Sequence, residues 1–284
     1  MLSALLKKFM RISRRLFRNT PIQKWKITTT IYRKTAGMTF KGETVTVDFR
    51  GAKIIYPGGD YTTLPTLSDG VYEQRELDRL IEYLDELKEP ISVVDVGANV
   101  GIWTVILGRH KNVKRIFAFE PSVENLNFLR KNIDLNHLSD QVEVHEVAVS
   151  DSVGTAKFVD GGSGATRRLS ADNETGSSMQ TVSLDSMLST FGEIGLIKID
   201  VEGFEPLVIK GMQSLIRAQR PALFIEYSRA QTEAAGLHWE SASQSLLSIY
   251  SEFELIDDKS TETRSSFEDL YRDNRLVNLA FGMK

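Results

Sequence analysis

Residues 91–107 combine a buried strand, a glycine-containing turn and a helix, and this order constrains the fold most strongly. The mostly apolar run Ile91–Val96 has the length of a strand and is followed by Gly97-Ala98-Asn99-Val100-Gly101. Apolar residues then recur at helical spacing from Ile102. Glycines suit such a turn because the backbone bends sharply and lets a ligand approach the N–H groups at the helix start. The sequence therefore predicts a binding site for a polar ligand at this turn.

A second apolar strand, Arg115–Phe119, ends at Glu120, which lies 23 residues after Gly97. A carboxylate at the carboxyl end of the second strand can accept hydrogen bonds from both hydroxyls of a ribose. Each signal is weak alone, but the turn and the carboxylate in this order predict a cofactor that contains a nucleoside.

The residues of the turn distinguish between two such cofactors. A dinucleotide-binding turn has the pattern G-x-G-x-x-G, whose second glycine makes room for a pyrophosphate, and Asn99 stands at that place here. Asp95 would repel a pyrophosphate, whereas it suits the ammonium group of an amino-acid tail or a sulfonium. We therefore expect S-adenosylmethionine rather than a nicotinamide dinucleotide. At this point the alternative stays open that Asp95 only caps the turn and Glu120 only ends a strand.

Four motifs occur in order along this part of the chain. They are D-V-G-A-N-V-G at 95–101, F-E-P at 119–121, A-V-S-D at 148–151 and K-I-D-V-E-G-F-E at 198–205. Together they resemble the FkbM family of S-adenosylmethionine-dependent methyltransferases, densely over residues 91–227 and loosely from there to the end.

The resemblance implies a fold, a reaction and a set of site residues. The implied fold is the class I methyltransferase fold, a Rossmann-like α/β fold with a mostly parallel seven-stranded sheet and helices on both faces. The implied reaction is methyl transfer, usually to an oxygen, and the acceptors are often sugars, glycolipids or secondary metabolites. The resemblance further places the ribose at Glu120, the adenine near Ser150, and the methionine end of the cofactor at Asp95, Gly97, Asn99 and Gly101.

The remaining predicted strands bring acidic residues to the same edge of the sheet. Right-handed βαβ units place the carboxyl ends of the strands 142–147, Ile194–Ile199 and Pro221–Ile225 on one rim. Asp200 directly follows the second of these strands and is our first candidate to take the proton of an acceptor hydroxyl. Glu202 and Glu226 are the next candidates, although capping or solvation would explain them equally well. The paired acids could instead hold a divalent cation that orients the acceptor oxygen, but no third ligand is apparent and we do not predict a metal site.

The rest of the domain is predicted from periodicity and turn residues. Gly154–Val182 is expected to be a long loop of the kind that acts as a lid or binding loop. We expect a helix over Gln231–Ile249, strands at Phe253–Ile256 and Leu276–Phe281, and an exposed charged link over Asp257–Asn274.

The first 70 residues are predicted to form an appendage to a methyltransferase domain over residues 71–284. Residues 1–41 contain eleven Lys or Arg and no acidic residue. Met1–Asn19 has the pattern of a basic amphipathic helix, which would either lie on an anionic membrane surface or pack on the domain. Alternating residues between Gly37 and Tyr56 predict a small β-element, a β-hairpin.

Composition limits the function classes and partners further. The chain has no Cys and only four His, which argues against disulfides and a zinc enzyme. Its basic residues concentrate at the start, so a nucleic-acid partner is not expected. We expect a small-molecule or glycan acceptor and a cytoplasmic protein, with residues 1–19 as a peripheral contact to the inner membrane surface. A nicotinamide-dependent oxidoreductase and a non-catalytic membrane adaptor remain the rival functions, and the sequence does not specify an oligomeric state.

Overall fold

The structure is a computed structural model that describes residues 44–58, 63, 67, 70, 72–160, 167–169, 177–257, 260–272 and 275–283. The contacts divide the chain into two compact units, Met1–Gln74 and Arg75–Lys284, whereas the sequence places the boundary after residue 70. The predicted helix over residues 1–19 lies outside the described residues. No helix in the described part is long and apolar enough to cross a bilayer.

The first unit contains the predicted β-hairpin. Its strands β1 (Thr44–Phe49) and β2 (Ala52–Pro57) pair antiparallel, with Phe49 opposite Ala52. The two connecting residues, Arg50 and Gly51, have φ values of +48° and +78°. Positive φ at both central residues is typical of the type I′ turn, whose twist matches that of a two-residue hairpin.

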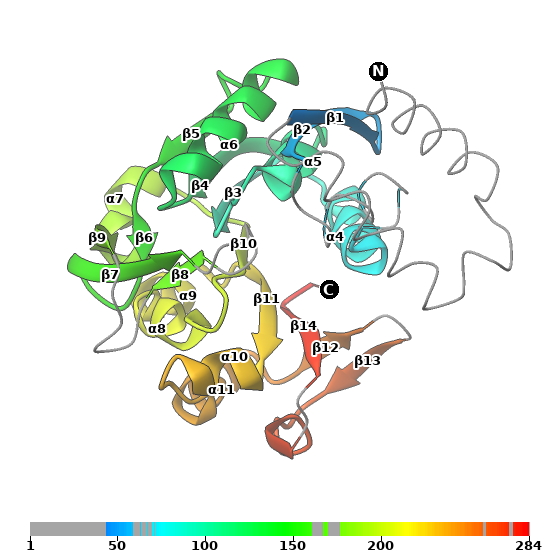
Figure 1. Cartoon of the computed structure of the whole chain (residues 1–284). Coiled ribbons are helices and arrows are strands. Elements are labelled where there is room, and N and C mark those ends of the chain that lie inside the picture. Colours follow the sequence, from blue (N-terminus) through cyan, green and yellow to red (C-terminus); the bar gives the residue numbers. More distant parts are fainter. Residues whose placement is uncertain are drawn as a thin grey trace, which may run out of the picture. The chain divides into compact units, whose positions relative to one another are not determined.

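The second unit is built on an eight-stranded mixed sheet with the order β13-β12-β14-β11-β10-β3-β4-β5 (Figure 1). Neighbouring strands from β11 to β5 are parallel, whereas β14 is antiparallel to both β11 and β12. The bounds are β3 (Ile91–Val96), β4 (Val113–Phe119), β5 (Val142–His145), β10 (Leu196–Ile199), β11 (Ala222–Ser228), β12 (Phe253–Ile256), β13 (Thr261–Arg264) and β14 (Leu276–Phe281). The predicted α/β class and the mostly parallel strand order of a class I methyltransferase sheet are confirmed.

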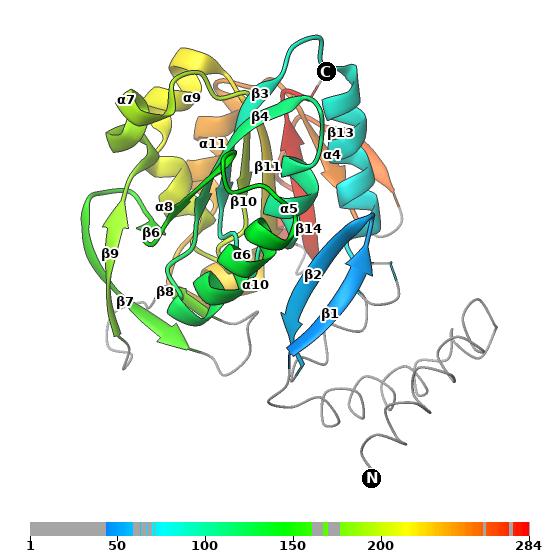
Figure 2. The ribbon, with the colours of Figure 1, turned by 90° about the horizontal axis from the view of Figure 1, so that it is seen from above.

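Helices cover both faces of this sheet (Figure 2). The bounds are α4 (Gln74–Glu86), α5 (Ile102–Gly108), α6 (Val123–Leu135), η3 (Leu184–Met187), α7 (Leu188–Phe191), α8 (Glu205–Lys210), α9 (Gln213–Gln219), α10 (Arg229–Ala234), α11 (Glu240–Leu247) and η4 (Leu270–Arg272). Alternate strand residues such as Val94, Ile197 and Leu223 join one hydrophobic core with residues of α8, α9 and α11. Since side chains alternate along a strand, their neighbours Asp95 and Lys198 face the other side, toward α5.

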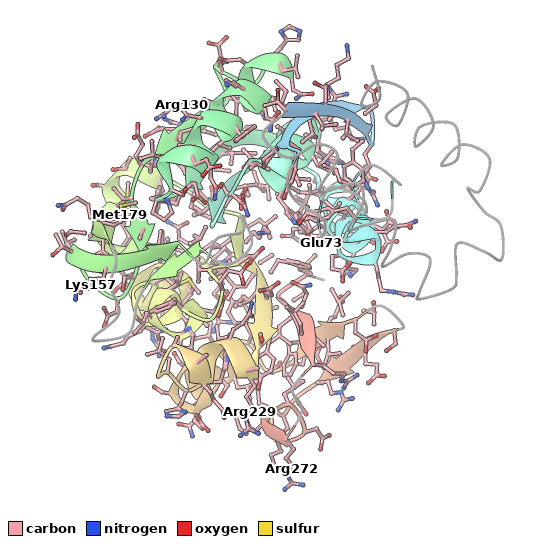
Figure 3. The ribbon with its side chains drawn as sticks, viewed as in Figure 1. Glu73, Arg130, Lys157, Met179, Arg229 and Arg272 are labelled. Carbon is pink, nitrogen blue, oxygen red and sulfur yellow. The ribbon has the colours of Figure 1, made fainter. Side chains whose placement is uncertain are left out.

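The prediction of a loop over Gly154–Val182 is wrong at both ends of this range. Strand β7 (Gly154–Asp160) pairs antiparallel with β9 (Ser177–Val182) and with β8 (Arg167–Leu169), and β6 (Ala148–Val149) completes a separate four-stranded sheet. The sequence Ser-Ser-Met-Gln-Thr-Val of β9 is mostly polar, so hydrophobic alternation does not mark it as a strand. Lys157 of this sheet lies at the periphery of the protein, as Arg272 does at another edge (Figure 3).

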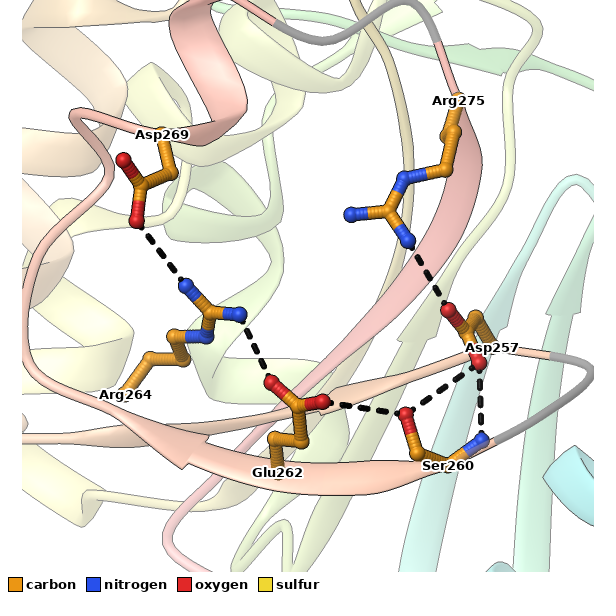
Figure 4. A network of polar contacts seen from close by, with 6 residues as sticks. All are labelled: Asp257, Ser260, Glu262, Arg264, Asp269 and Arg275. Carbon is orange, nitrogen blue, oxygen red and sulfur yellow. Dashed lines mark hydrogen bonds and ion pairs between the residues drawn. The ribbon is translucent and has the colours of Figure 1, made fainter.

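The predicted exposed link Asp257–Asn274 contains the eighth strand, β13, which the sequence does not predict. Its four residues are polar, and it lies at the edge of the sheet, paired with β12. Ion pairs accompany this edge: Arg264 contacts Glu262 and Asp269, and Arg275 contacts Asp257 (Figure 4). Edge strands of natural sheets are often charged in this way, because charge discourages pairing with another chain.

Two element boundaries also differ from the prediction. Strand β11 continues to Ser228, so Glu226 lies within the strand, opposite Asn278 of β14, and not at the strand's end. The helix predicted over Gln231–Ile249 is two helices, α10 and α11. Gly236 lies between them with a φ of +72°, a backbone conformation that ends a helix.

Candidate active site

The turn that follows β3 brings neighbouring backbone segments into close approach. Gly97 has a φ of +82°, and a Cβ atom there would lie 2.9 Å from the carbonyl carbon of Asp200 and closer still to its oxygen. Gly101 has a φ of +88°, and a Cβ there would lie 2.6 Å from Cδ1 of Leu129 in α6. At Gly97 the left-handed backbone and the lack of space both require glycine, whereas at Gly101 the left-handed backbone is the main reason. The predicted glycine turn therefore packs between the end of β10 and α6.

Glu120 anchors this turn from the end of β4. The backbone N–H of Asn99 donates to Oε2 at 2.8 Å, while the N–H of Ser122 at 2.9 Å and Nδ2 of Asn125 at 3.2 Å donate to Oε1. The side chain is buried, and hydrogen bonds to a carboxylate are roughly twice as strong as neutral ones. One carboxylate thus joins the glycine turn, the end of β4 and the start of α6. The sequence predicts only a ribose contact for this residue, and the anchoring role is additional.

Two buried side-chain oxygens at the turn have no hydrogen-bond partner among the described residues, namely Oδ1 of Asn99 and Oδ1 of Asp95. A buried acceptor without a donor costs about 1–3 kcal/mol, so a ligand that supplies N–H groups would stabilise it. The ammonium group of an amino acid offers three such donors. The residues of this turn therefore fit the amino-acid end of the predicted cofactor.

Asp95 lies beneath the turn, with no solvent exposure. The Thr104 hydroxyl donates to its Oδ2 at 2.6 Å, and Nζ of Lys198 lies 3.9 Å from its Oδ1. Burial raises the pKa of Asp95, while the nearby Lys198 ammonium and the hydrogen bond from Thr104 oppose this rise. Asp95 thus places a carboxyl group directly behind the predicted donor site.

Asp200 follows β10 and lies beside the glycine turn. Its N–H donates to the carbonyl oxygen of Val96 at 3.0 Å, which continues the parallel pairing of β10 with β3. Its side chain is 27% exposed, and Oδ2 accepts a hydrogen bond from Nζ of Lys198 at 3.1 Å. Asp200 is therefore a partly accessible carboxylate with a fixed orientation next to the predicted donor site.

The other two candidate carboxylates have different surroundings. Ile199 pairs with Ile225, so one further residue along the parallel strands brings Asp200 beside Glu226. Glu202, with a φ of +56°, accepts a hydrogen bond from Nε2 of Gln231 in α10. Among the described residues, no three His, Cys, Asp or Glu side chains are grouped in a way that would hold a metal ion.

Ser150, predicted near the adenine, lies at the end of β6. The Ser150 N–H donates to the carbonyl oxygen of Val182 at 2.8 Å. A Cβ atom at Gly211 would approach the carbonyl group of Ser150 closely. These contacts lead to β9 and to the link between α8 and α9. The structure thus groups the other five cofactor candidates around the glycine turn, while the placement of Ser150 at the adenine stays a prediction.

Sequence reasoning missed one buried acid, Glu205, at the start of α8. Its Oε1 accepts from the N–H groups of Val201 at 3.0 Å and Gly203 at 3.1 Å, so it fixes the loop that follows Asp200. Burial raises its pKa to about 7, although these hydrogen bonds favour the charged form. An acid beside Pro206 in the first helical turn is a recognisable signal for such a cap, and it was available in the sequence.

The site's arrangement agrees with a comparison against known families. A family model described as the methyltransferase FkbM domain matches residues 95–263. This chain belongs to the FkbM methyltransferase family. The match begins at Asp95 and includes the glycine turn, Glu120 and the loop after β10. The predicted resemblance is thereby confirmed.

The individual proteins to which this chain is similar have low sequence identity to it. The hexuronic acid methyltransferase AglP of Haloferax volcanii is 29% identical over 148 residues, which are 51% of this chain and 59% of that protein. A crystal structure of the methyltransferase FkbM from Methylobacillus flagellatus is 19% identical, with 78% of this chain and 53% of that chain covered and a TM-score of 0.44. A crystal structure of a SAM-dependent methyltransferase from Agrobacterium tumefaciens is 8% identical, with 86% and 71% covered and a TM-score of 0.51. The last likeness shows a shared fold.

Proposed function

We propose that this protein transfers the methyl group of S-adenosylmethionine to a hydroxyl oxygen of a sugar-containing acceptor. The single observation that carries the proposal is the joint position of the anchored glycine turn and Asp200. At the turn, Oδ1 of Asn99 is a buried acceptor without a hydrogen bond that suits an amino-acid tail, and Asp200 lies at the tip of the adjacent strand. Membership in the FkbM family supports methyl transfer over the rival dehydrogenase and adaptor functions.

The donor would be held by the residues around the turn. Oδ1 of Asn99 suits its ammonium group, the carboxyl group of Asp95 contributes negative charge from below, and Glu120 suits the ribose hydroxyls. Gly97 and Gly101 let the turn pack closely against the end of β10 and α6, and Ser150 is the proposed neighbour of the adenine. When bound, the donor supplies an activated methyl group on a positively charged sulfur.

The protein's part in the reaction is positioning and proton removal. The bound donor would supply the methyl group to the acceptor oxygen and would keep the electron pair of the broken carbon–sulfur bond on its sulfur. The hydroxyl proton must leave at the same time, and Asp200 is the proposed general base that takes it. A base within hydrogen-bond reach typically contributes about 10²- to 10⁴-fold to the rate. Glu226 and Glu202 are the alternative bases on the same edge of the sheet.

A sugar acceptor is supported by the relative whose name states that it methylates hexuronic acid. Such an acceptor offers two kinds of oxygen, the ring hydroxyls and the carboxylate. We propose the hydroxyl, because a carboxylate is already deprotonated at neutral pH and needs no base, whereas the site provides Asp200.

The proposal is tested with a methyl-labelled donor and three acceptors: a hexuronic acid glycoside, the matching neutral hexose glycoside and fractionated cell extract. We expect label in a saccharide or glycolipid product that survives mild alkali, since alkali cleaves a methyl ester but not a methyl ether. An alkali-labile product would contradict hydroxyl methylation while leaving methyl transfer intact. Label on protein, or no transfer with any fraction, would contradict the proposal as a whole.

A further inference from the structure

Lys198 is a buried cation within the central sheet. It occupies the third position of β10, and its side chain is only 4% exposed. The labelled basic side chains Lys157 and Arg272, by contrast, lie at the periphery of the protein (Figure 3). Removing an ammonium group from water costs several kcal/mol unless it is paired, so a lysine at this position needs a specific reason.

The partners of Lys198 connect the two halves of the candidate site. The strand register places Lys198 directly beside Asp95 of β3 and beside Phe224 of β11. Its Nζ lies 3.1 Å from Oδ2 of Asp200, 3.9 Å from Oδ1 of Asp95 and 5.5 Å from the centre of the Trp103 ring. The same ammonium group therefore contacts the carboxyl group beneath the donor turn and the carboxylate proposed as the base.

We propose that Lys198 is a positioning residue for methyl transfer, which keeps Asp200 charged and fixes Oδ2 so that Oδ1 faces the acceptor hydroxyl. This inference rests on the proposed function. It assigns a role to Lys198, to which the resemblance to the family gives none. In this proposal Asp200 and not Lys198 meets the acceptor, because the Lys198 side chain is only 4% exposed and that of Asp200 is 27% exposed.

The charges around Lys198 explain why a cation is needed. The carboxyl groups in contact with it are those of Asp95 in β3 and Asp200 after β10. The continued strand register brings Glu226 of β11 beside Asp200, and Glu205 of α8 interacts electrostatically with Asp200. Neighbouring carboxylates repel one another, and this repulsion favours a proton on one of them unless a cation offsets it. A carboxylic acid that holds its proton cannot take another from the acceptor, so the base would be lost.

The test is the pH dependence of kcat for Lys198→Met and Lys198→Arg beside the wild-type protein. For Lys198→Met we expect the acid limb of the profile to move up by about one to three pH units, so that kcat on the acid side falls by roughly ten- to a thousand-fold. Activity should recover as the pH rises. Lys198→Arg keeps the charge and should keep the limb near its original position. The control is Lys210→Met, which removes an exposed lysine 2.7 Å from Asp151 and should leave the profile unchanged.

An equal loss for Lys198→Met at every pH would show a merely structural role and overturn the proposal. A second measurement does not depend on activity. If Lys198 compensates Asp200, the double variant Lys198→Met/Asp200→Asn should melt at a higher temperature than Lys198→Met alone, because the double variant does not leave the Asp200 charge without its partner. Additive effects of the two substitutions would overturn the pairing. If the wild-type protein transfers no methyl group but this coupling is found, the proposed function fails while the pairing stands.

Discussion

The close approach of the β3 and β10 ends can be tested by Gly97→Ala. The native φ of +82° costs an alanine about 1–2 kcal/mol, because its Cβ approaches the following carbonyl oxygen. The new Cβ would also lie well inside van der Waals distance of the Asp200 carbonyl group, and such overpacking typically costs about 1–3 kcal/mol more. The total of about 2–5 kcal/mol is a large part of the roughly 5–15 kcal/mol that stabilises a typical domain.

The matched control is Gly192→Ala. Gly192 has a φ of +65°, and a Cβ there would have no heavy atom within 4 Å. Its ψ of −140° places it outside the left-handed helical region, so this variant should lose only a conformational part of about 1–3 kcal/mol. Urea unfolding followed by tryptophan fluorescence measures both variants, and the comparison is valid where the m-value is unchanged. Equal unfolding free energies for the two variants would refute the account of why the turn needs glycine.

Three further predictions concern separate parts of the chain. Glu120→Gln should weaken donor binding at least about tenfold, as measured by calorimetry. An amide cannot accept hydrogen bonds at both ends, so one N–H group of the turn loses its acceptor. Unchanged affinity for the donor would contradict the anchoring role of Glu120. The folded pKa of Glu205, about 7, lies above its ordinary value of 4.5. The unfolding free energy of the wild-type protein should therefore fall relative to that of Glu205→Gln by up to about 3 kcal/mol as the pH rises from 4.5 to 7. Parallel curves of unfolding free energy against pH would contradict this. Deletion of residues 1–19 should abolish sedimentation with anionic vesicles and leave methylation of a soluble acceptor unchanged, whereas equal sedimentation of both proteins would exclude this segment as the membrane contact.

The centre of the fold could be predicted because its signals are local. The strands β3, β4 and β10 are mostly apolar, and each is followed by a residue that stands out in the sequence: Gly97, Glu120 and Asp200. Topology then brings these ends to one edge of the sheet, so the grouping of the turn with Asp200 follows from the right-handed connections alone. The β-hairpin in the first unit was predictable from alternation for the same reason.

The elements that the sequence does not predict depend on contacts with segments distant along the chain, and a local sequence pattern does not contain these contacts. Strand β9 and strand β13 are polar, and each is defined by the strand with which it pairs. Glu226 was placed at a strand end because the sequence gives no sign that β14 extends the pairing. The contact between Lys198 and Asp95 follows from strand register, which the sequence of one strand does not reveal, whereas Asp200 is only two residues from Lys198 along the chain.

A calorimetric titration of the purified protein with S-adenosylhomocysteine, the demethylated donor, tests the central claim most directly. The account predicts saturable binding at one site per chain, and it predicts that Asn99→Ala weakens this binding because the acceptor for the ammonium group is lost. NAD⁺ should give no binding heat in a parallel titration. Absence of binding by the demethylated donor together with saturable binding of NAD⁺ would contradict the account.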